Sequence, residues 1–160
     1  MRRYAPGKSD LHHRIAPATP CYSWIMDDEL KGVSILVVED DKDTRDLLRV
    51  LLQSEGGGVI AAGSVAEALS AYDKSRPNVI VADIGLPDYN GYALIGRVRA
   101  RDRERGGLVP AIALTAYTTA IDRDTVLSAG FQVHMPKPFE PSLLISVIAD
   151  LASRYKKLGS

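Results

Sequence analysis

The sequence predicts an α/β fold in which a doubly wound parallel sheet carries helices on both faces. Its first support is a set of short apolar runs rich in Val and Ile, which lie at residues 33–38, 59–62, 78–83, 110–114 and 131–135. Such runs are typical of parallel strands that are buried on both faces. Its second support is the spacing between the runs, because stretches with helical apolar periodicity separate them and strand and helix alternate along the chain.

Composition indicates one globular domain. The chain has 160 residues, of which 46% are hydrophobic and 25% are charged. Its 20 basic residues balance 20 acidic residues, so charge gives no argument for nucleic acid or an anionic membrane as a partner. A lone cysteine, Cys21, excludes an intrachain disulfide. No apolar run approaches the roughly 20 residues that span a bilayer, and we therefore expect a cytoplasmic location.

The first 30 residues are predicted to form a flexible arm or linker. They contain Pro6, Pro17 and Pro20 and show no periodicity. The pair His12-His13 has no further His or Cys at ligand spacing, which favours a solvated tail over a metal site. Residues 31–155 are then expected to form the domain and residues 156–160 a short tail, with no output domain expected. A stand-alone protein and an excised end of a longer one both fit this organisation.

Each predicted helix has a local reason to form. Residues 44–52 place apolar side chains on one face and are followed by three glycines. Ser64 and Glu67 have the spacing of a capping box, so a helix runs from there to about residue 74. Further helices are expected at 92–101, at about 119–129 and from Pro141 onward. The last one has a predicted core stripe of five residues: Leu143, Leu144, Val147, Ile148 and Leu151.

An arginine run begins within the third of these helices and continues beyond it. Its members alternate along the chain at Arg97, Arg99, Arg101, Arg103 and Arg105. A period of two spreads charge around a helix instead of building one basic face. The pattern therefore favours a solvated helix end over a nucleic-acid surface.

Asp83 is the residue around which the chain is organised. It ends the most apolar of the predicted strands, and ligands of open α/β sheets bind outside the carboxyl ends of the strands. A turn or helix-capping role is the alternative for an Asp in this position.

Polar residues also follow the other strands: Glu39 and Asp40 the first, Thr115 the fourth, and Lys137 the fifth. Parallel strands bring these residues to one edge of the sheet, where the repulsion between carboxylates calls for a cation. Oxygen ligands without His or Cys suit Mg²⁺. A hydroxyl and an ammonium beside the metal would bind phosphoryl oxygens, and Asp83 is a plausible nucleophile that forms an aspartyl phosphate.

At these positions the chain resembles the receiver domain of two-component response regulators. The resemblance covers residues 32–154 and rests on the segments 35–41, 83–91, 114–116 and 137–139, in family order and spacing. Within the family it looks most like the receivers of hybrid sensor histidine kinases. It implies a flavodoxin-like sheet with strand order 2-1-3-4-5.

The resemblance also implies roles for individual residues. Asp83 is the phosphoacceptor, and Thr115 and Lys137 bind the phosphoryl group once it has formed. Glu39, Asp40, Asp83 and the backbone carbonyl of Gly85 hold Mg²⁺.

Partners follow from the resemblance as well. The donor is a histidine kinase or a histidine phosphotransfer domain. A downstream protein binds the face made by the helix near 119–129, the fifth strand and the last helix, and a homodimer is left open. No direct contact with nucleic acid or membrane is implied.

His134 departs from the common family pattern. Three residues before the lysine, where many members have a Tyr or Phe that moves on phosphorylation, this chain has His134. Either the imidazole occupies the switch pocket together with Thr115, or His134 is a surface residue at the end of a strand.

Three other functions compete with the phosphorylation switch. An Mg²⁺-dependent phosphohydrolase would need a second carboxylate two residues after Asp83, where this chain has Gly85. A degenerate receiver that docks without phosphorylation does not need the acidic pair or Lys137. A flavodoxin-type cofactor domain would want a phosphate-binding loop where this chain has acidic residues. The sequence therefore favours a signalling domain over an enzyme.

Overall fold

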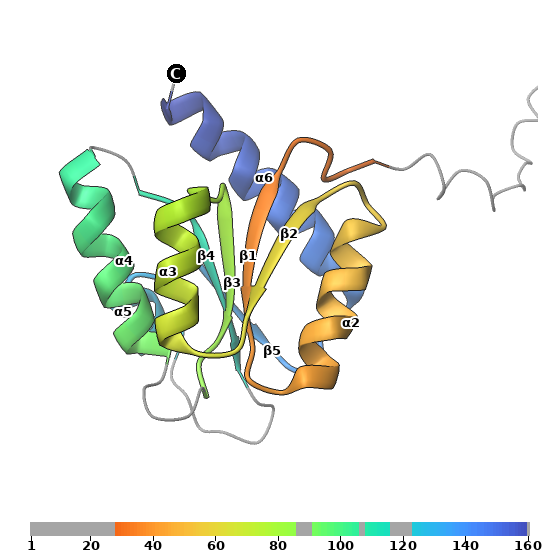
Figure 1. Cartoon of the computed structure of the whole chain (residues 1–160), viewed down its shortest axis with the longest axis horizontal. Helices are drawn as coiled ribbons and strands as arrows, with labels where there is room; N and C mark the ends of the chain where they lie inside the picture. Colours follow the sequence, from red (N-terminus) through yellow and green to blue (C-terminus); the bar gives the residue numbers. More distant parts are fainter. Residues whose placement is uncertain (1–27, 86–90, 106–107, 116–122, 160) are drawn as a thin grey trace, which may run out of the picture.

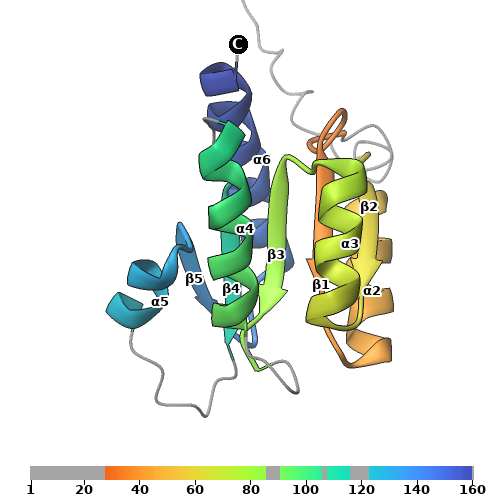
Figure 2. The same ribbon diagram turned by 60° about the vertical axis from the view of Figure 1, so that its left-hand side comes forward.

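The computed structural model describes residues 28–85, 91–105, 108–115 and 123–159. Five parallel strands form one sheet in the order β2-β1-β3-β4-β5, which confirms the predicted fold class and strand order (Figures 1 and 2). Strands and helices alternate in the described part of the chain as follows: β1 (Ser34–Val38), α2 (Lys42–Gln53), β2 (Gly58–Ala62), α3 (Val65–Ser75), β3 (Val79–Asp83), α4 (Gly91–Arg105), β4 (Ala111–Thr115), α5 (Arg123–Ala129), β5 (Val133–Pro136) and α6 (Pro141–Gly159).

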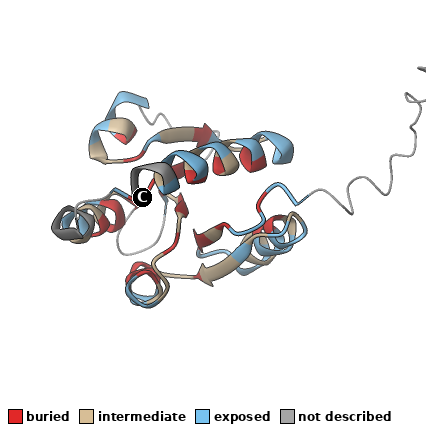
Figure 3. Cartoon of the chain, turned by 90° about the horizontal axis from the view of Figure 1, so that it is seen from above, coloured by how far each residue is buried: buried red, intermediate tan, exposed pale blue. Residues whose placement is uncertain are grey.

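Helices cover both faces of the sheet, and each face has its own apolar core (Figure 1). Helices α2 and α6 pack on one face through residues such as Leu48 and Leu144. Helices α3, α4 and α5 pack on the other face through residues such as Leu69, Leu94 and Val126. Seen from above, the helices are buried on the sides that face the sheet and exposed on their outer sides (Figure 3). The central strands are therefore shielded on both faces, as their apolar sequences require.

Two helices begin at side-chain caps. The Ser64 hydroxyl accepts a hydrogen bond from the Glu67 amide, which confirms Ser64 as the predicted cap. The Glu67 carboxylate accepts from the Gly63 amide, one residue before the amide that a capping box would use. Asp41 caps α2 by accepting hydrogen bonds from the amide and the hydroxyl of Thr44.

The predicted core stripe of α6 is wrong at Leu143. This side chain is 51% exposed, whereas Leu144, Ile145 and Ile148 are buried against the sheet. Leu143 lies in the first turn of α6, where the direction of a side chain depends on the angle at which the helix packs on the sheet. Helical periodicity in the sequence does not reveal that angle. Helix α6 also continues to Gly159, beyond the start of the predicted tail.

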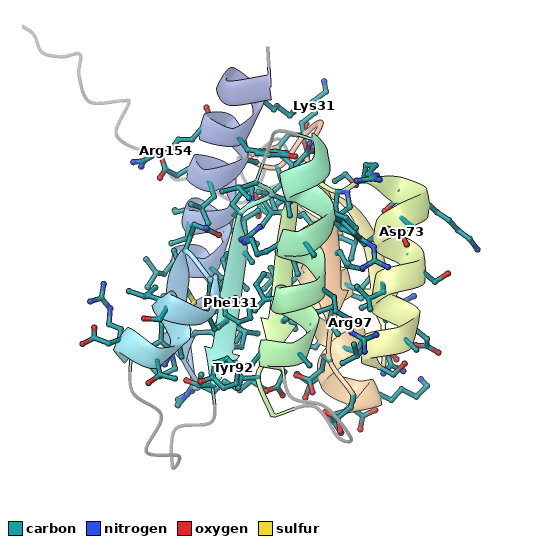
Figure 4. The ribbon with its side chains drawn as sticks, turned by 90° about the vertical axis from the view of Figure 1, so that its left-hand side faces the viewer. Lys31, Asp73, Tyr92, Arg97, Phe131 and Arg154 are labelled. Carbon is teal, nitrogen blue, oxygen red and sulfur yellow. The ribbon has the colours of Figure 1, made fainter. Side chains whose placement is uncertain are left out.

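Leu30 lies inside the domain, although the sequence analysis placed it at the end of the arm. Its side chain is fully buried in the α2/α6 core, and its amide donates to the Glu55 carbonyl at 2.9 Å. The predicted strand at 131–135 also begins later, at Val133, and Phe131 packs instead between α5 and α4 (Figure 4). Residues 1–27 and the predicted beginning of α5 lie outside the described residues.

The arginine run is only partly solvated. Arg99 donates from Nε and Nη2 to the Gly130 carbonyl at 3.0 and 2.7 Å, and from Nη2 to Gln132 Oε1 at 2.9 Å. Arg101 pairs with Asp73 of α3 at 2.8 Å. Two of the arginines therefore tie α4 to its neighbours, which the sequence did not predict. The side chains of Arg103 and Arg105 lie outside the described residues.

None of the helices in the described part of the chain combines the length and the apolar composition that crossing a bilayer requires.

The neighbours Leu143 and Leu144 give a direct test of the packing of α6. We expect Leu144→Ala to lower the free energy of unfolding by about 2–5 kcal/mol, because it opens a cavity in the core. Leu143→Ala should change it by less than about 0.5 kcal/mol. Denaturant unfolding of both variants checks this, and equal losses would contradict the observed phase of the helix.

Candidate functional site

The register of the strands brings the predicted site residues to one edge of the sheet. Val38 pairs with Ala82, and Asp83 pairs with Leu114, so Glu39, Asp83 and Thr115 follow at neighbouring strand ends. The Lys137 amide then donates to the Thr115 carbonyl at 2.7 Å, which extends the same edge to β5. Residues that are far apart in the sequence therefore lie together because their strands end together.

Three carboxylates converge at this edge. Glu39, Asp40 and Asp83 each place an oxygen within 4.8 Å of the others. Glu39 is only 2% exposed, Asp83 is half-buried and Asp40 is exposed. An oxygen-only donor set of this kind fits Mg²⁺, which accepts one or two carboxylates and keeps several waters.

The Lys137 ammonium bridges two of the carboxylates. Its Nζ lies 3.1 Å from Glu39 Oε1 and 3.2 Å from Asp83 Oδ2. Burial alone would lower the pKa of Lys137, but the charge of Asp83 and the hydrogen bond and charge of Glu39 raise it overall. The group therefore remains a cation at neutral pH and partly offsets the repulsion between the acids.

Burial dominates the ionisation of Glu39. It raises the pKa of this carboxyl above the ordinary value of 4.5, and the charge of Asp83 adds to the increase. The Asp41 amide, which donates to Glu39 Oε2 at 3.1 Å, and the Lys137 ammonium oppose it. Glu39 therefore holds a proton at a higher pH than an ordinary glutamate does.

Asp41 does not join the cluster, although it is next to Glu39 and Asp40 in the sequence. Its carboxylate caps α2, and the hydrogen bonds from Thr44 lower its pKa. An Asp three residues before a Thr at the start of a predicted helix is a sequence signal for such a cap.

Arg45 also supports the site, and the sequence analysis missed it. Its Nη1 donates to the Glu39 carbonyl at 2.9 Å and to the Asp40 carbonyl at 3.4 Å, which fixes the backbone of the acidic pair. Arg45 could not be predicted because a hydrogen bond from a side chain to a backbone carbonyl leaves no recognisable pattern in the sequence.

The turn after β3 is held against the end of that strand. The Gly85 amide donates to Asp83 Oδ1 at 2.9 Å, whereas the role of its carbonyl as a metal ligand stays a prediction. A Cβ at Gly91 would lie 3.1 Å from the Ile84 Cα and 3.2 Å from the Asp83 carbonyl oxygen. A side chain at this position would require α4 and the end of β3 to separate by a few tenths of an ångström.

Thr115 and His134 form a separate pair. Thr115 is 2% exposed, and its Oγ1 lies 2.9 Å from His134 Nε2. The structure therefore brings together the two residues that the sequence analysis named as the switch. Ala116, which follows Thr115 in the family motif, lies outside the described residues.

Comparison with known proteins adds the family. A model of the response regulator receiver domain matches residues 35–149. The chain belongs to the response regulator receiver domain family. The receiver is therefore a signalling domain of the kind found in two-component systems, and the resemblance seen in the sequence is confirmed.

Relatives of the receiver differ in length. It is 44% identical to an uncharacterised 14.6-kDa protein of Leptolyngbya boryana, over 74% of this chain and 89% of that protein. It is 34% identical to the transcriptional regulatory protein TrcR of Mycobacterium tuberculosis, over 79% of this chain and 48% of that protein. The chain thus spans about half the length of the transcriptional regulators that it matches.

Solved receivers have the same fold. The receiver domain of the sensor histidine kinase PA1611 from Pseudomonas aeruginosa is 30% identical, with a TM-score of 0.68 and 76% and 98% of the two chains covered. That structure has a magnesium ion coordinated in its active site cleft. A receiver domain from Francisella superposes with a TM-score of 0.69 at 25% identity, covering 77% and 98% of the two chains.

The raised pKa of Glu39 predicts how Mg²⁺ binding depends on pH. Protons compete with the metal for this carboxylate, so the Kd for Mg²⁺ should begin to rise at a pH above 4.5 as the solution is acidified. Amide NMR shifts during Mg²⁺ titrations at a series of pH values measure this. Glu39→Gln should move the midpoint of the pH dependence to lower pH, and an unchanged midpoint would contradict the assignment.

Proposed function

We propose that this receiver accepts a phosphoryl group on Asp83 from a phosphohistidine donor and changes its protein partners as a result. The observation that carries the proposal is that the Asp83 carboxylate shares one cluster with the Glu39 and Asp40 oxygens and lies 3.2 Å from the Lys137 ammonium, which also contacts Glu39. The arrangement supports both binding of a metal and binding of a phosphoryl group at the same carboxylate.

The transfer is a displacement at phosphorus. An oxygen of the Asp83 carboxylate forms the new bond to phosphorus as the bond to the donor imidazole nitrogen breaks, and the electron pair of that bond stays on the nitrogen. The Lys137 ammonium is placed to hold a phosphoryl oxygen, because it already contacts Asp83 Oδ2 at 3.2 Å. No second substrate is turned over, since the position two residues after Asp83 is Gly85 and offers no general acid.

Glu39, Asp40 and Asp83 would hold Mg²⁺. When bound, the ion supplies positive charge that offsets the negative charge of the phosphoryl oxygens.

The donor is proposed to dock on the apolar groove beside the site. One side of the groove is lined by residues of α2: Thr44, Leu47, Leu48 and Leu51. The other side is lined by the segment after β5: Lys137, Pro138, Phe139 and Pro141. Leu47 is 68% exposed, which is unusual for a large apolar side chain. Lys137 belongs to both the groove and the phosphoryl site, so a protein seated in the groove has its phosphohistidine close to Asp83.

The changed partners are proposed to bind the face formed by α5, β5 and α6. Thr115 at the end of β4 contacts His134 of β5, so a movement of Thr115 reaches this face directly. The phosphoryl group adds about −1.5 to −2 charges at the edge of the sheet, which is a large local change in potential.

Phosphorylation of Asp83 is tested by intact mass after incubation with acetyl phosphate and Mg²⁺. The parent chain should gain one phosphoryl group that hydroxylamine removes, and Asp83→Asn should gain none. Removal of Mg²⁺ with a chelator should abolish the gain. A parent chain that binds Mg²⁺ but gains no mass would overturn the proposal in favour of docking without phosphorylation.

Donor docking is tested by charge substitutions on α2. Leu47→Asp should slow transfer from any histidine-phosphorylated protein that labels the parent chain by about tenfold or more, because it places a charge in the apolar contact. Val50→Asp is the matched control, since Val50 is 62% exposed on the same helix and does not line the groove.

Both variants should accept phosphate from acetyl phosphate at the parent rate. A parallel loss with the small donor, or equal slowing by the two substitutions, would show that the groove is not the docking surface.

A further inference from the structure

The hydrogen bond between Thr115 and His134 lies on the opposite side of the sheet from the carboxylates. His134 pairs in register with Ala113, whose side chain is in the α3/α4/α5 core, so the alternation of the strands sends both switch residues to that side. Glu39, Asp83 and Lys137 each come two residues after a member of the α2/α6 core, namely Val37, Val81 and Met135, so the same alternation sends them to the α2/α6 side. Thr115 is thus the group that connects the phosphoryl site to the α5 side.

Thr115 directly follows Leu114, the residue that pairs with Asp83 between β3 and β4. Asp83 pairs with Leu114, and the Ile84 amide donates to the Leu114 carbonyl at 3.0 Å. Neighbouring strands lie about 4.8 Å apart. The backbone of Thr115 therefore lies beside the end of β3, and a turn of its side chain over the end of the strand would bring the hydroxyl toward a phosphoryl group on Asp83.

Proton counting limits how Thr115 can serve both neighbours. A hydroxyl has one proton to donate and two lone pairs that accept, and phosphoryl oxygens are acceptors. If the hydroxyl proton is given to His134 Nε2, none remains for the phosphoryl group. If Nε2 carries a proton and donates to Oγ1, the hydroxyl proton is free for a phosphoryl oxygen.

We infer that His134 is a positioning residue for the phosphorylated state, in which its Nε2–H donates to Thr115 Oγ1 while the Thr115 hydroxyl donates to a phosphoryl oxygen on Asp83. The inference rests on the proposed function and goes beyond it. It gives this chain a continuous path of three groups from the phosphoryl site to β5, and Phe at position 134 would have no N–H to complete it.

Burial makes the pairing consequential. Thr115 is almost fully buried and His134 is half-buried. A Thr115 hydroxyl that lost its hydrogen bond to His134 would therefore find little water as a replacement partner. Among the described residues, His134 is the hydrogen-bond partner of the Thr115 hydroxyl. The imidazole therefore decides which direction that hydroxyl faces before phosphate arrives, and loss of its N–H should weaken retention of the phosphoryl group.

The experiment uses the full chain with Mg²⁺ and beryllium fluoride, which mimics the phosphoryl group on a carboxylate. His134→Phe keeps a ring of similar size but has no N–H, and it should bind beryllium fluoride about three- to tenfold more weakly than the parent. His134→Gln, which keeps an N–H donor, should recover part of the loss.

A double-mutant cycle separates positioning from packing. Thr115→Val removes the hydroxyl, and in that background His134→Phe should have little further effect on the affinity. A loss of the same size in both backgrounds would overturn the inference, because the effect would then not pass through the hydroxyl.

A spectroscopic measurement tests the proton itself. In a chain with His12→Gln and His13→Gln, His134 is the remaining histidine of the three in the sequence. Its ¹⁵N NMR signals should show a protonated Nε2 when beryllium fluoride is bound, and an unprotonated Nε2 in that state would refute the inference. If the parent chain does not bind beryllium fluoride at all, it is the proposed function that fails.

Discussion

The Lys137 ammonium between Glu39 and Asp83 is the interaction on which the site depends. Three carboxylates within 4.8 Å repel one another, and one of them is almost fully buried. Lys137 reaches two of them because β5 is paired to β4 at the Thr115 carbonyl. Removal of one member of such a buried pair leaves an uncompensated charge, which typically costs about 3–5 kcal/mol. The carboxylates are therefore held together by a lysine that follows β5, the edge strand of the sheet.

The sequence predicted the parts of the structure that depend on local pattern. Asp83 was found because an apolar strand ends on it, and Ser64 because a helix cap is a local motif. It did not predict that Arg99 binds the carbonyl of Gly130, because that contact joins residues 31 apart and has no periodicity. Leu143 was misplaced because helical phase at a first turn depends on packing.

The candidate site divides in the same way. The residue types and the end of each strand were visible in the sequence, since parallel strands that end on polar residues share an edge. The side of the sheet to which each residue points was not read from the sequence, because it depends on the register between strands. That register places Thr115 and His134 on one side and the carboxylates with Lys137 on the other. Their hydrogen bond is a product of this pairing.

Gly91 has a mechanical consequence. It lets α4 begin close to the end of β3, and eight residues later Arg99 donates hydrogen bonds to the carbonyl of Gly130, which follows α5. A helix of 15 residues is a rigid rod about 22 Å long. Helix α4 therefore contacts β3 at its first residue, Gly91, and the turn before β5 at its middle, through Arg99. We expect a shift of the turn after Asp83 to move α4 as a unit, and the Arg99 hydrogen bonds to Gly130 would then connect that shift to the segment before β5, in addition to the hydrogen bond between Thr115 and His134.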